Sequence, residues 1–140
     1  MTSEPHDFVL EPVGRVASPL VEREAAPMQG DEGAPDAWLV FDRRYAEALQ
    51  GLRIGQEVLV LTWLDRADRT TLAVHPRGDP GRQVTGVFNT RSPDRPNPIG
   101  LHRVTILRIE AARVQVRNLE ALDGTPVLDV KPVLEPLGER

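Results

Sequence analysis

A proline-rich segment, residues 86–101 (GVFNTRSPDRPNPIGL), carries the residues best suited to hold an anion or another polar ligand. Its three prolines fix the backbone φ angle and favour extended geometry in the residues before them. The segment is therefore predicted to be a stiff loop that presents Arg91 and Arg95. A rigid frame lowers the ordering cost of binding. The loop is either a preformed ligand clamp or a rigid crossover with two solvated arginines.

A second segment, residues 118–132 (NLEALDGTPVLDVKP), gathers three carboxylates, Glu120, Asp123 and Asp129. One interpretation is a turn carboxylate together with an Asp–Lys pair on a strand. The other is a set of polar groups and backbone carbonyls that face a ligand. The residues alone leave both interpretations open.

Thiol chemistry and metal binding find no support in the sequence. There is no cysteine, which excludes a thiol nucleophile, a disulfide framework and thiolate metal ligands. The histidines, His6, His75 and His102, are too scattered to predict a metal site, and the last two are expected to cap, pack or face solvent. The motifs G-x-S-x-G, G-x-G-x-x-G and H-E-x-x-H and the P-loop are also absent. An open doubly wound sheet is therefore not expected.

The charge pattern is uneven along the chain. A net charge of −4 argues against nonspecific binding of nucleic acid. Between residues 63 and 108, however, eight arginines stand against four acids, and the acidity lies towards the two ends. Codon usage in a GC-rich genome accounts for the preference for arginine over lysine but not for this clustering. The cluster is suited to an anionic partner.

The length of 140 residues (15.5 kDa) predicts a single domain, residues 1–140. Residues 1–7 are predicted to be disordered. No apolar run approaches the roughly 20 residues of a transmembrane helix. The N-terminus lacks the basic start and apolar stretch of a secretory signal. We therefore expect a cytoplasmic protein without a membrane partner.

Short strands separated by turn signals must position these segments. The predicted strands are 37–41, 57–64, 70–75, 83–89, 99–110, 113–119 and 125–130, with one or two more within 8–18. A helix is predicted at 43–50, with Asp42 as its N-cap, and loops at 19–36 and 90–98. This pattern predicts a mainly β fold, an antiparallel barrel or sandwich with one or two short helices.

The two segments together closely resemble the TsaA-like, or TrmO, family. Its members are S-adenosylmethionine-dependent tRNA methyltransferases that methylate N6 of threonylcarbamoyladenosine, the modified base next to the anticodon. The family pattern GVFATRSPxRPNPIGLS, then LDLLDGTPVLDIKPY, matches residues 86–101 and 119–132. Weaker matches are residues 13–19 (VGRVASP) with the family's IGxIxSP and residues 27–29 (PMQ) with its PxQ.

The resemblance implies a compact, non-Rossmann β-barrel and a homodimer in which both subunits contribute to the cofactor site. Compared with longer members of the family, we expect no C-terminal extension domain. It implies S-adenosylmethionine as cofactor, bound by Gln29, Gly30, Asp31, Leu64, Asp65, Arg91, Leu101, Arg117, Asn118, Leu119 and Glu120.

The chain departs from the family pattern at several positions. The family's FSHLWxxxxFH stretch aligns with residues 55–65 (GQEVLVLTWLD), so Leu64 replaces the terminal histidine and Asp65 its neighbour. His102 replaces the serine after the PNPIGL motif, and Glu120 replaces an aspartate. These changes favour a different acceptor, whereas the clustered arginines favour tRNA.

Methyl transfer from a sulfonium depends chiefly on positioning the acceptor. Adenine N6 is a poor nucleophile, and a carboxylate that orients or removes its proton would help. Asp123 and Asp65 are the candidate catalytic residues, and Arg95, His102 and Arg103 the candidate contacts to RNA. The alternatives are a small-molecule acceptor with the same cofactor, or a non-catalytic module that binds S-adenosylmethionine.

Overall fold

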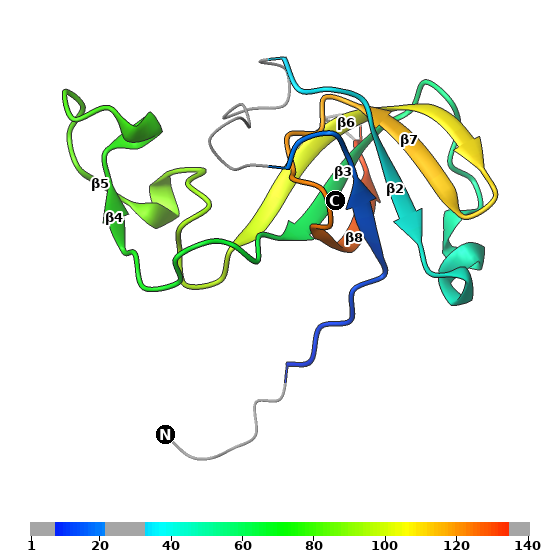
Figure 1. The fold of residues 1–140 in the computed structure, drawn as a ribbon, viewed down its shortest axis with the longest axis horizontal. Coiled ribbons are helices and arrows are strands. Elements are labelled where there is room, and N and C mark those ends of the chain that lie inside the picture. Colours follow the sequence, from blue (N-terminus) through cyan, green and yellow to red (C-terminus); the bar gives the residue numbers. More distant parts are fainter. Residues whose placement is uncertain (1–7, 22–32, 135–140) are drawn as a thin grey trace.

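The computed structural model describes residues 8–21 and 33–134, so the expectations for residues 1–7 and for the cofactor contacts Gln29, Gly30 and Asp31 lie outside the described residues. Six strands form a closed antiparallel barrel in the order β1-β2-β7-β6-β3-β8 (Figure 1). They are β1 (Gly14–Ala17), β2 (Ala37–Phe41), β3 (Glu57–Trp63), β6 (Ile99–Glu110), β7 (Arg113–Arg117) and β8 (Pro126–Pro132). The prediction of a mainly β, antiparallel fold is confirmed.

Alternating side chains fill the barrel from its strands. β3 and β6 pair from Glu57↔Thr105 to Trp63↔Ile99, and every second residue of each strand points inward. The inward residues are Val58, Val60 and Thr62 on β3, and Gly100, His102, Val104 and Ile106 on β6. The apolar ones join a single cluster with Leu39 and Val127. The polar ones gather at one end, where β3 ends and β6 begins, which we call the barrel mouth.

A 3-10 helix, η3 (Arg43–Leu49), leads from β2 towards β3 at the helix position predicted from the sequence. Asp42 is its N-cap, as predicted, because the Asp42 carboxylate accepts a hydrogen bond from the backbone N–H of Arg44 at 3.0 Å. Leu49 and Leu52 are half-buried against the barrel core. This segment therefore closes the end of the barrel opposite the mouth region (Figure 1).

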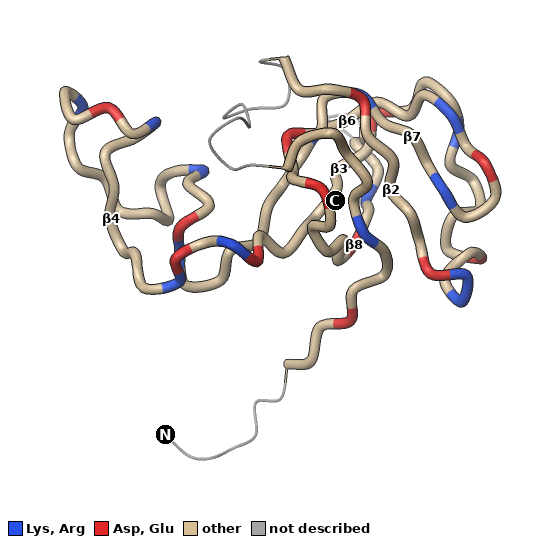
Figure 2. Tube along the Cα trace, in the orientation of Figure 1, with Lys and Arg blue, Asp and Glu red and all other residues tan. Residues whose placement is uncertain are grey.

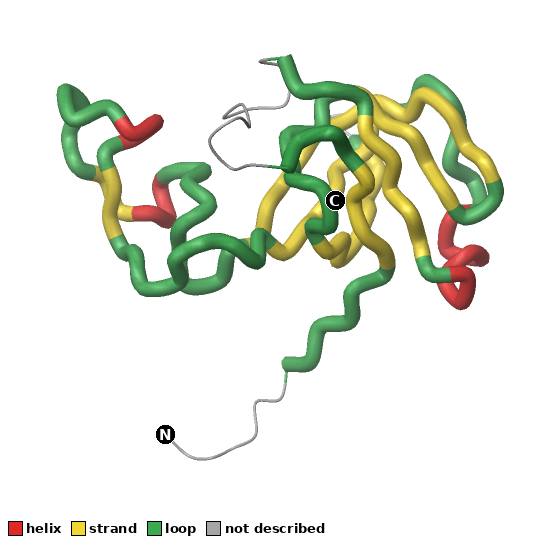
Figure 3. Tube along the Cα trace, in the orientation of Figure 1, coloured by secondary structure: helices red, strands yellow, loops and turns green. Residues whose placement is uncertain are grey.

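Residues 64–98, which we call the arm, leave the barrel after β3 and return to it at β6. The arm is mostly loop (Figure 3) and contains β4 (Ala73–Val74), β5 (Thr85–Gly86) and the 3-10 helices η4 (Pro76–Gly78) and η5 (Val87–Asn89). The predicted strands 70–75 and 83–89 are therefore wrong in extent. β4 and β5 pair only with each other, through two residue pairs. No third strand among the described residues extends this ladder.

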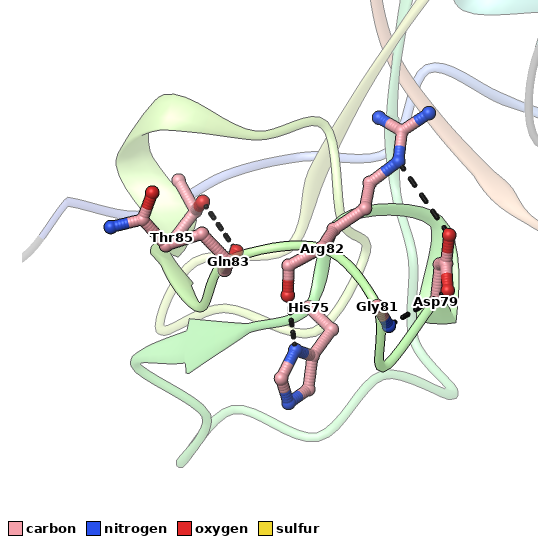
Figure 4. Close-up of polar contacts among 6 residues, drawn as sticks. All are labelled: His75, Asp79, Gly81, Arg82, Gln83 and Thr85. Carbon is pink, nitrogen blue, oxygen red and sulfur yellow. Dashed lines mark hydrogen bonds and ion pairs between the residues drawn. The ribbon is translucent and has the colours of Figure 1, made fainter.

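Side-chain contacts to the backbone hold the tip of the arm (Figure 4). The His75 ring donates from Nδ1 to the carbonyl oxygen of Arg82 at 2.8 Å, and the Asp79 carboxylate accepts from the backbone N–H of Gly81 at 2.9 Å. Arg82 also lies 3.9 Å from the Asp79 carboxylate, an exposed ion pair. Turns of this kind explain why the tip is loop rather than strand. No helix among the described residues is long and apolar enough to span a membrane.

Candidate functional site

An open groove of about 930 Å³ lies where the arm meets the barrel mouth. The barrel contributes the start of β6 and residues 120–122 and 125, which precede β8. The arm contributes residues 64–67, 74–78 and 88–95. The groove is thus built from segments that are far apart in the sequence, and closure of the barrel brings them together.

Five of the predicted cofactor contacts line this groove: Leu64, Asp65, Arg91, Leu101 and Glu120. They come from the end of β3, the proline-rich loop, the start of β6 and the segment after β7. Asp65, Arg91 and Leu101 are exposed. The groove therefore offers a cation, two carboxylates and apolar surface to one ligand.

Three other predicted cofactor contacts do not line the groove. Leu119 is fully buried in the barrel core, and Arg117 is exposed at the end of β7. Asn118 between them has a φ of 70°, a left-handed conformation that asparagine tolerates better than most residues. The buried Leu119 side chain instead fixes the position of the next residue, Glu120.

The predicted catalytic residue Asp123 also lies outside the groove lining. Its carboxylate accepts a hydrogen bond from the backbone N–H of Ser18 at 3.0 Å, and its own N–H donates to the carbonyl oxygen of Leu20 at 2.7 Å. Asp123 therefore ties the segment after β1 to the turn before β8. Of the two candidate catalytic carboxylates, only Asp65 lies in the groove.

Arg95 is directed into its own loop and not towards an external partner. Its guanidinium donates to the carbonyl oxygens of Val87, Thr90 and Ser92 at 2.8, 3.0 and 2.8 Å. The prediction that Arg95 extends a surface for RNA stays a prediction, but these bonds already take up three of the five N–H donors of its guanidinium. The proline-rich loop is held by this arginine as well as by its prolines.

Arg69 holds the same loop from its other side. Its Nε donates to the carbonyl oxygen of Pro96 at 2.7 Å, and its guanidinium lies 5.1 Å from the centre of the Trp63 ring. The loop is thereby fastened to the end of β3. Arg91 is left exposed in the groove, as a preformed clamp requires.

The other two predicted RNA contacts, His102 and Arg103, lie on opposite faces of β6. His102 points inward and is 5% exposed, so it does not present a surface to RNA. Arg103 lies on the outside of the barrel and donates to Glu57 at 2.8 Å. This hydrogen bond lowers the pKa of Glu57 and raises that of Arg103. His102 and Arg103 point to opposite sides because successive residues of a strand alternate between the two faces of the sheet.

Comparison with known proteins identifies the family of this chain. The family description "tRNA-methyltransferase O N-terminal domain" matches residues 15–137. The chain belongs to the TrmO family. The crystal structure of TrmO from Pseudomonas aeruginosa superimposes with a TM-score of 0.76 at 31% identity. That match covers 99% of this chain and 60% of the solved one, so the chain spans less than two thirds of that protein.

Two archaeal relatives match over most of their length. An S-adenosyl-L-methionine-binding protein of Archaeoglobus fulgidus is 45% identical over 125 residues, which cover 89% of this chain and 88% of the relative. A probable S-adenosyl-L-methionine-binding protein of Methanothermobacter thermautotrophicus is 42% identical and covers 91% of each chain. These relatives carry names that refer to cofactor binding.

The arginines of residues 63–108 do not gather on one face of this TrmO-family chain. Figure 2 shows basic positions both on the arm and on the barrel side remote from it. Several are neutralised by acids, in the pairs Arg82–Asp79, Arg103–Glu57 and Arg108–Glu110. The excess of positive charge in the sequence therefore does not by itself make an RNA-binding surface.

Sequence reasoning missed four residues that shape the groove. Phe88 and Ile99 line it with apolar surface, and Phe88 is 87% exposed. Thr62 and Gly100 lie inside the barrel mouth, directly opposite each other on β3 and β6. Thr62 had a signal in the sequence, because it is the one hydroxyl residue in the apolar run of residues 57–64.

Proposed function

We propose that this protein binds S-adenosylmethionine in the groove at the barrel mouth and transfers its methyl group to N6 of threonylcarbamoyladenosine, next to the tRNA anticodon, in the cytoplasm. The convergence of Leu64, Asp65, Arg91, Leu101 and Glu120 carries this proposal. Membership of the TrmO family and the names of the archaeal relatives support it.

The groove fits the chemical groups of this cofactor. Arg91 would pair with the cofactor carboxylate, because a guanidinium forms two parallel hydrogen bonds to such a group. Glu120 would accept hydrogen bonds from hydroxyl or ammonium donors. Leu64 and Leu101 supply apolar surface for the rest of the molecule. Residues 29–31, implied by the family resemblance, would complete the site.

The cofactor supplies an electrophilic methyl group, and the chain's residues position the acceptor for an in-line displacement. Asp65 is the exposed groove carboxylate that we assign to the N6 proton of the acceptor. In this proposal Asp123 has a structural role, because its carboxylate accepts a hydrogen bond from the backbone N–H of Ser18. Asp65→Asn would then lower the rate of transfer more than the affinity for the cofactor.

A second candidate function is cofactor binding without transfer to tRNA, either as a binding module or with a small-molecule acceptor. The acid-paired arginines and the names of the archaeal relatives favour it. Both candidates share the cofactor and differ only in the acceptor.

We also propose that the protein acts as a homodimer whose second copy covers the arm. Leu72, Val84 and Phe88 project from the arm with 69%, 56% and 87% of their surface exposed. Apolar groups so exposed gain from burial in an interface. Light scattering should give twice the chain mass of 15.5 kDa at micromolar concentration. A monomer mass would contradict the proposed homodimer.

The test is methyl transfer from labelled S-adenosylmethionine to bulk tRNA, with tRNA that lacks the threonylcarbamoyl modification as the control acceptor. We expect label only in the modified tRNA. Arg91→Ala should weaken cofactor binding by about 1.5–3 kcal/mol, the value typical of a charged hydrogen bond. Arg82→Ala, at the tip of the arm, is the matched control and should bind normally. Binding without transfer would favour the second candidate.

A further inference from the structure

A polar network is buried at the barrel mouth beneath the groove. The His102 side chain is 4% exposed, yet both of its ring nitrogens are bonded. Nε2 lies 2.7 Å from Oγ1 of Thr62, and Nδ1 is hydrogen-bonded to Oε1 of Glu120. The methyl transfer proposed above makes no use of His102 or Thr62.

The chemistry of the partners fixes where the proton lies. A carboxylate only accepts hydrogen bonds, so Nδ1 of His102 carries the proton and donates it to Glu120. The Thr62 hydroxyl both donates and accepts, so it satisfies Nε2 whether or not that nitrogen is protonated. The His102 ring is thus hydrogen-bonded on both sides, and rotation of the ring would break at least one of these hydrogen bonds.

The strands leave space for this network at Gly100. A Cβ on Gly100 would lie 2.4 Å from Oγ1 of Thr62 and 2.7 Å from Nε2 of His102, closer than such atoms approach. Gly100 and Thr62 face each other directly in the β3–β6 ladder. Glycine is therefore required at this position if the Thr62–His102 hydrogen bond is to form.

Glu120 connects the buried network to the groove. Its neighbours Leu119 and Ala121 are buried, whereas the Glu120 side chain is 17% exposed and lines the groove. Oε1 is bonded to His102. Among the described residues no hydrogen bond to Oε2 is found, which leaves that oxygen for a donor on a bound ligand.

We propose that His102 is a positioning residue, which with Thr62 orients the Glu120 carboxylate so that its second oxygen accepts a hydrogen bond from a hydroxyl or ammonium group of the ligand. The inference rests on the S-adenosylmethionine site proposed above. According to this proposal, His102 raises the affinity for the ligand through Glu120 and does more than fill space in the barrel.

Two amide substitutions of His102 distinguish its role in orienting Glu120 from its role in packing. Asparagine places its amide group near the position of the histidine Nδ1, and glutamine places it near Nε2. His102→Asn therefore keeps a donor for Glu120, and His102→Gln keeps a partner for Thr62 only. Glu120→Gln removes the charge of the acceptor directly, and circular dichroism checks that every variant is folded.

Calorimetric titration with S-adenosylmethionine is the test. We expect His102→Gln to bind about tenfold or more weakly, as for a lost charge-assisted contact, and His102→Asn to recover most of the affinity. Adding Glu120→Gln to His102→Gln should cause little further loss, because both changes remove the same interaction. A difference between the amide variants that persists with 5′-methylthioadenosine assigns the donor to the ribose hydroxyls; one that disappears assigns it to the ammonium group.

Equal affinity in wild type, His102→Asn and His102→Gln would overturn the positioning role while leaving the cofactor site in place. Additive losses in the double variant would overturn it as well. A wild-type protein that binds no S-adenosylmethionine would overturn the proposed function itself. A further readout needs no ligand: the NMR signal of the His102 Nδ1–H proton should move in Glu120→Gln, and an unmoved signal would show that the two side chains are not bonded.

Discussion

In the barrel, inward side chains from six strands pack into one apolar cluster. The arm is instead fastened by arginine side chains that donate to backbone carbonyls and by an aspartate side chain that accepts from a backbone N–H. Val60 and Val127 in the barrel are fully buried, while Leu72 and Phe88 in the arm are 69% and 87% exposed. Burial of apolar area gives the barrel most of its stability. The arm depends instead on specific polar contacts and, in the proposed homodimer, on the second copy that covers its apolar residues. One wall of the groove is therefore the tightly packed barrel, and the other is the arm, which polar contacts hold in place.

The largest expected effect comes from a matched pair of leucines. Leu39 is 1% exposed inside the barrel, so Leu39→Ala should lower the free energy of unfolding by about 2–5 kcal/mol, through lost transfer energy and the cavity left behind. Leu72→Ala on the arm should change it by no more than about 0.5 kcal/mol. Urea unfolding of the dilute protein measures both. Similar losses in the two variants would show that the arm has a core of its own.

A second effect should be confined to the arm. Arg95→Ala removes three hydrogen bonds to loop carbonyls, each of the charged kind worth about 1.5–3 kcal/mol. Hydrogen exchange of residues 87–95 should accelerate, while exchange within β3 and β6 stays slow. Arg91→Ala, in the same loop, is the control and should leave exchange unaltered. Faster exchange throughout the barrel would contradict the separation of the two regions.

A third effect concerns the contact between the two halves of the arm. The Asp94 carboxylate accepts from the backbone N–H of Asp68 at 2.9 Å. Asp94→Ala should cost about 1 kcal/mol of local stability, and Asp94→Asn, which keeps an acceptor oxygen, should cost less. Limited proteolysis within the arm measures the difference. Equal cleavage of both variants would remove this contact from the account.

The smallest effect is expected on the outside of the barrel. Arg103 lowers the pKa of Glu57, chiefly by hydrogen bonding. A carboxyl whose folded pKa is depressed adds stability above its unfolded pKa, and this is lost as the pH falls through the folded value. Arg103→Ala should raise the Glu57 pKa in an NMR titration and slightly flatten the acid side of the stability profile. An unchanged Glu57 pKa would show that the exposed pair does not form in solution.

The barrel strands were predictable because their partners enforce the alternation that the sequence displays. β2 and β6 have the predicted bounds, residues 37–41 and 99–110. Residues 70–75 and 83–89 have similar composition but form strands of only two residues. At Thr70, the backbone N–H and the hydroxyl both donate to the Asp68 carboxylate, so a local turn replaces strand pairing there.

The candidate site was predictable where the family motifs gave its positions, but the directions of side chains were not all foreseen. His102 follows the same alternation as Val104 and Ile106, so its inward direction could have been predicted from the strand assignment. The internal hydrogen bonds of Arg95 could not, because their acceptors depend on the path of the loop in space. For the same reason, Asp123 could not be excluded from the groove by sequence alone.

An NMR titration of the isotope-labelled protein with S-adenosylmethionine tests the central claim most directly, because it shows where the cofactor binds. Shifted backbone amide signals are expected at Leu64, Asp65, Arg91, Leu101 and Glu120, the groove residues at the barrel mouth. Signals from the outer barrel residues Arg108 and Arg113 should stay in place. Shifts confined to the outer surface, or no shifts at saturating cofactor, would contradict the assignment of the groove as the cofactor site.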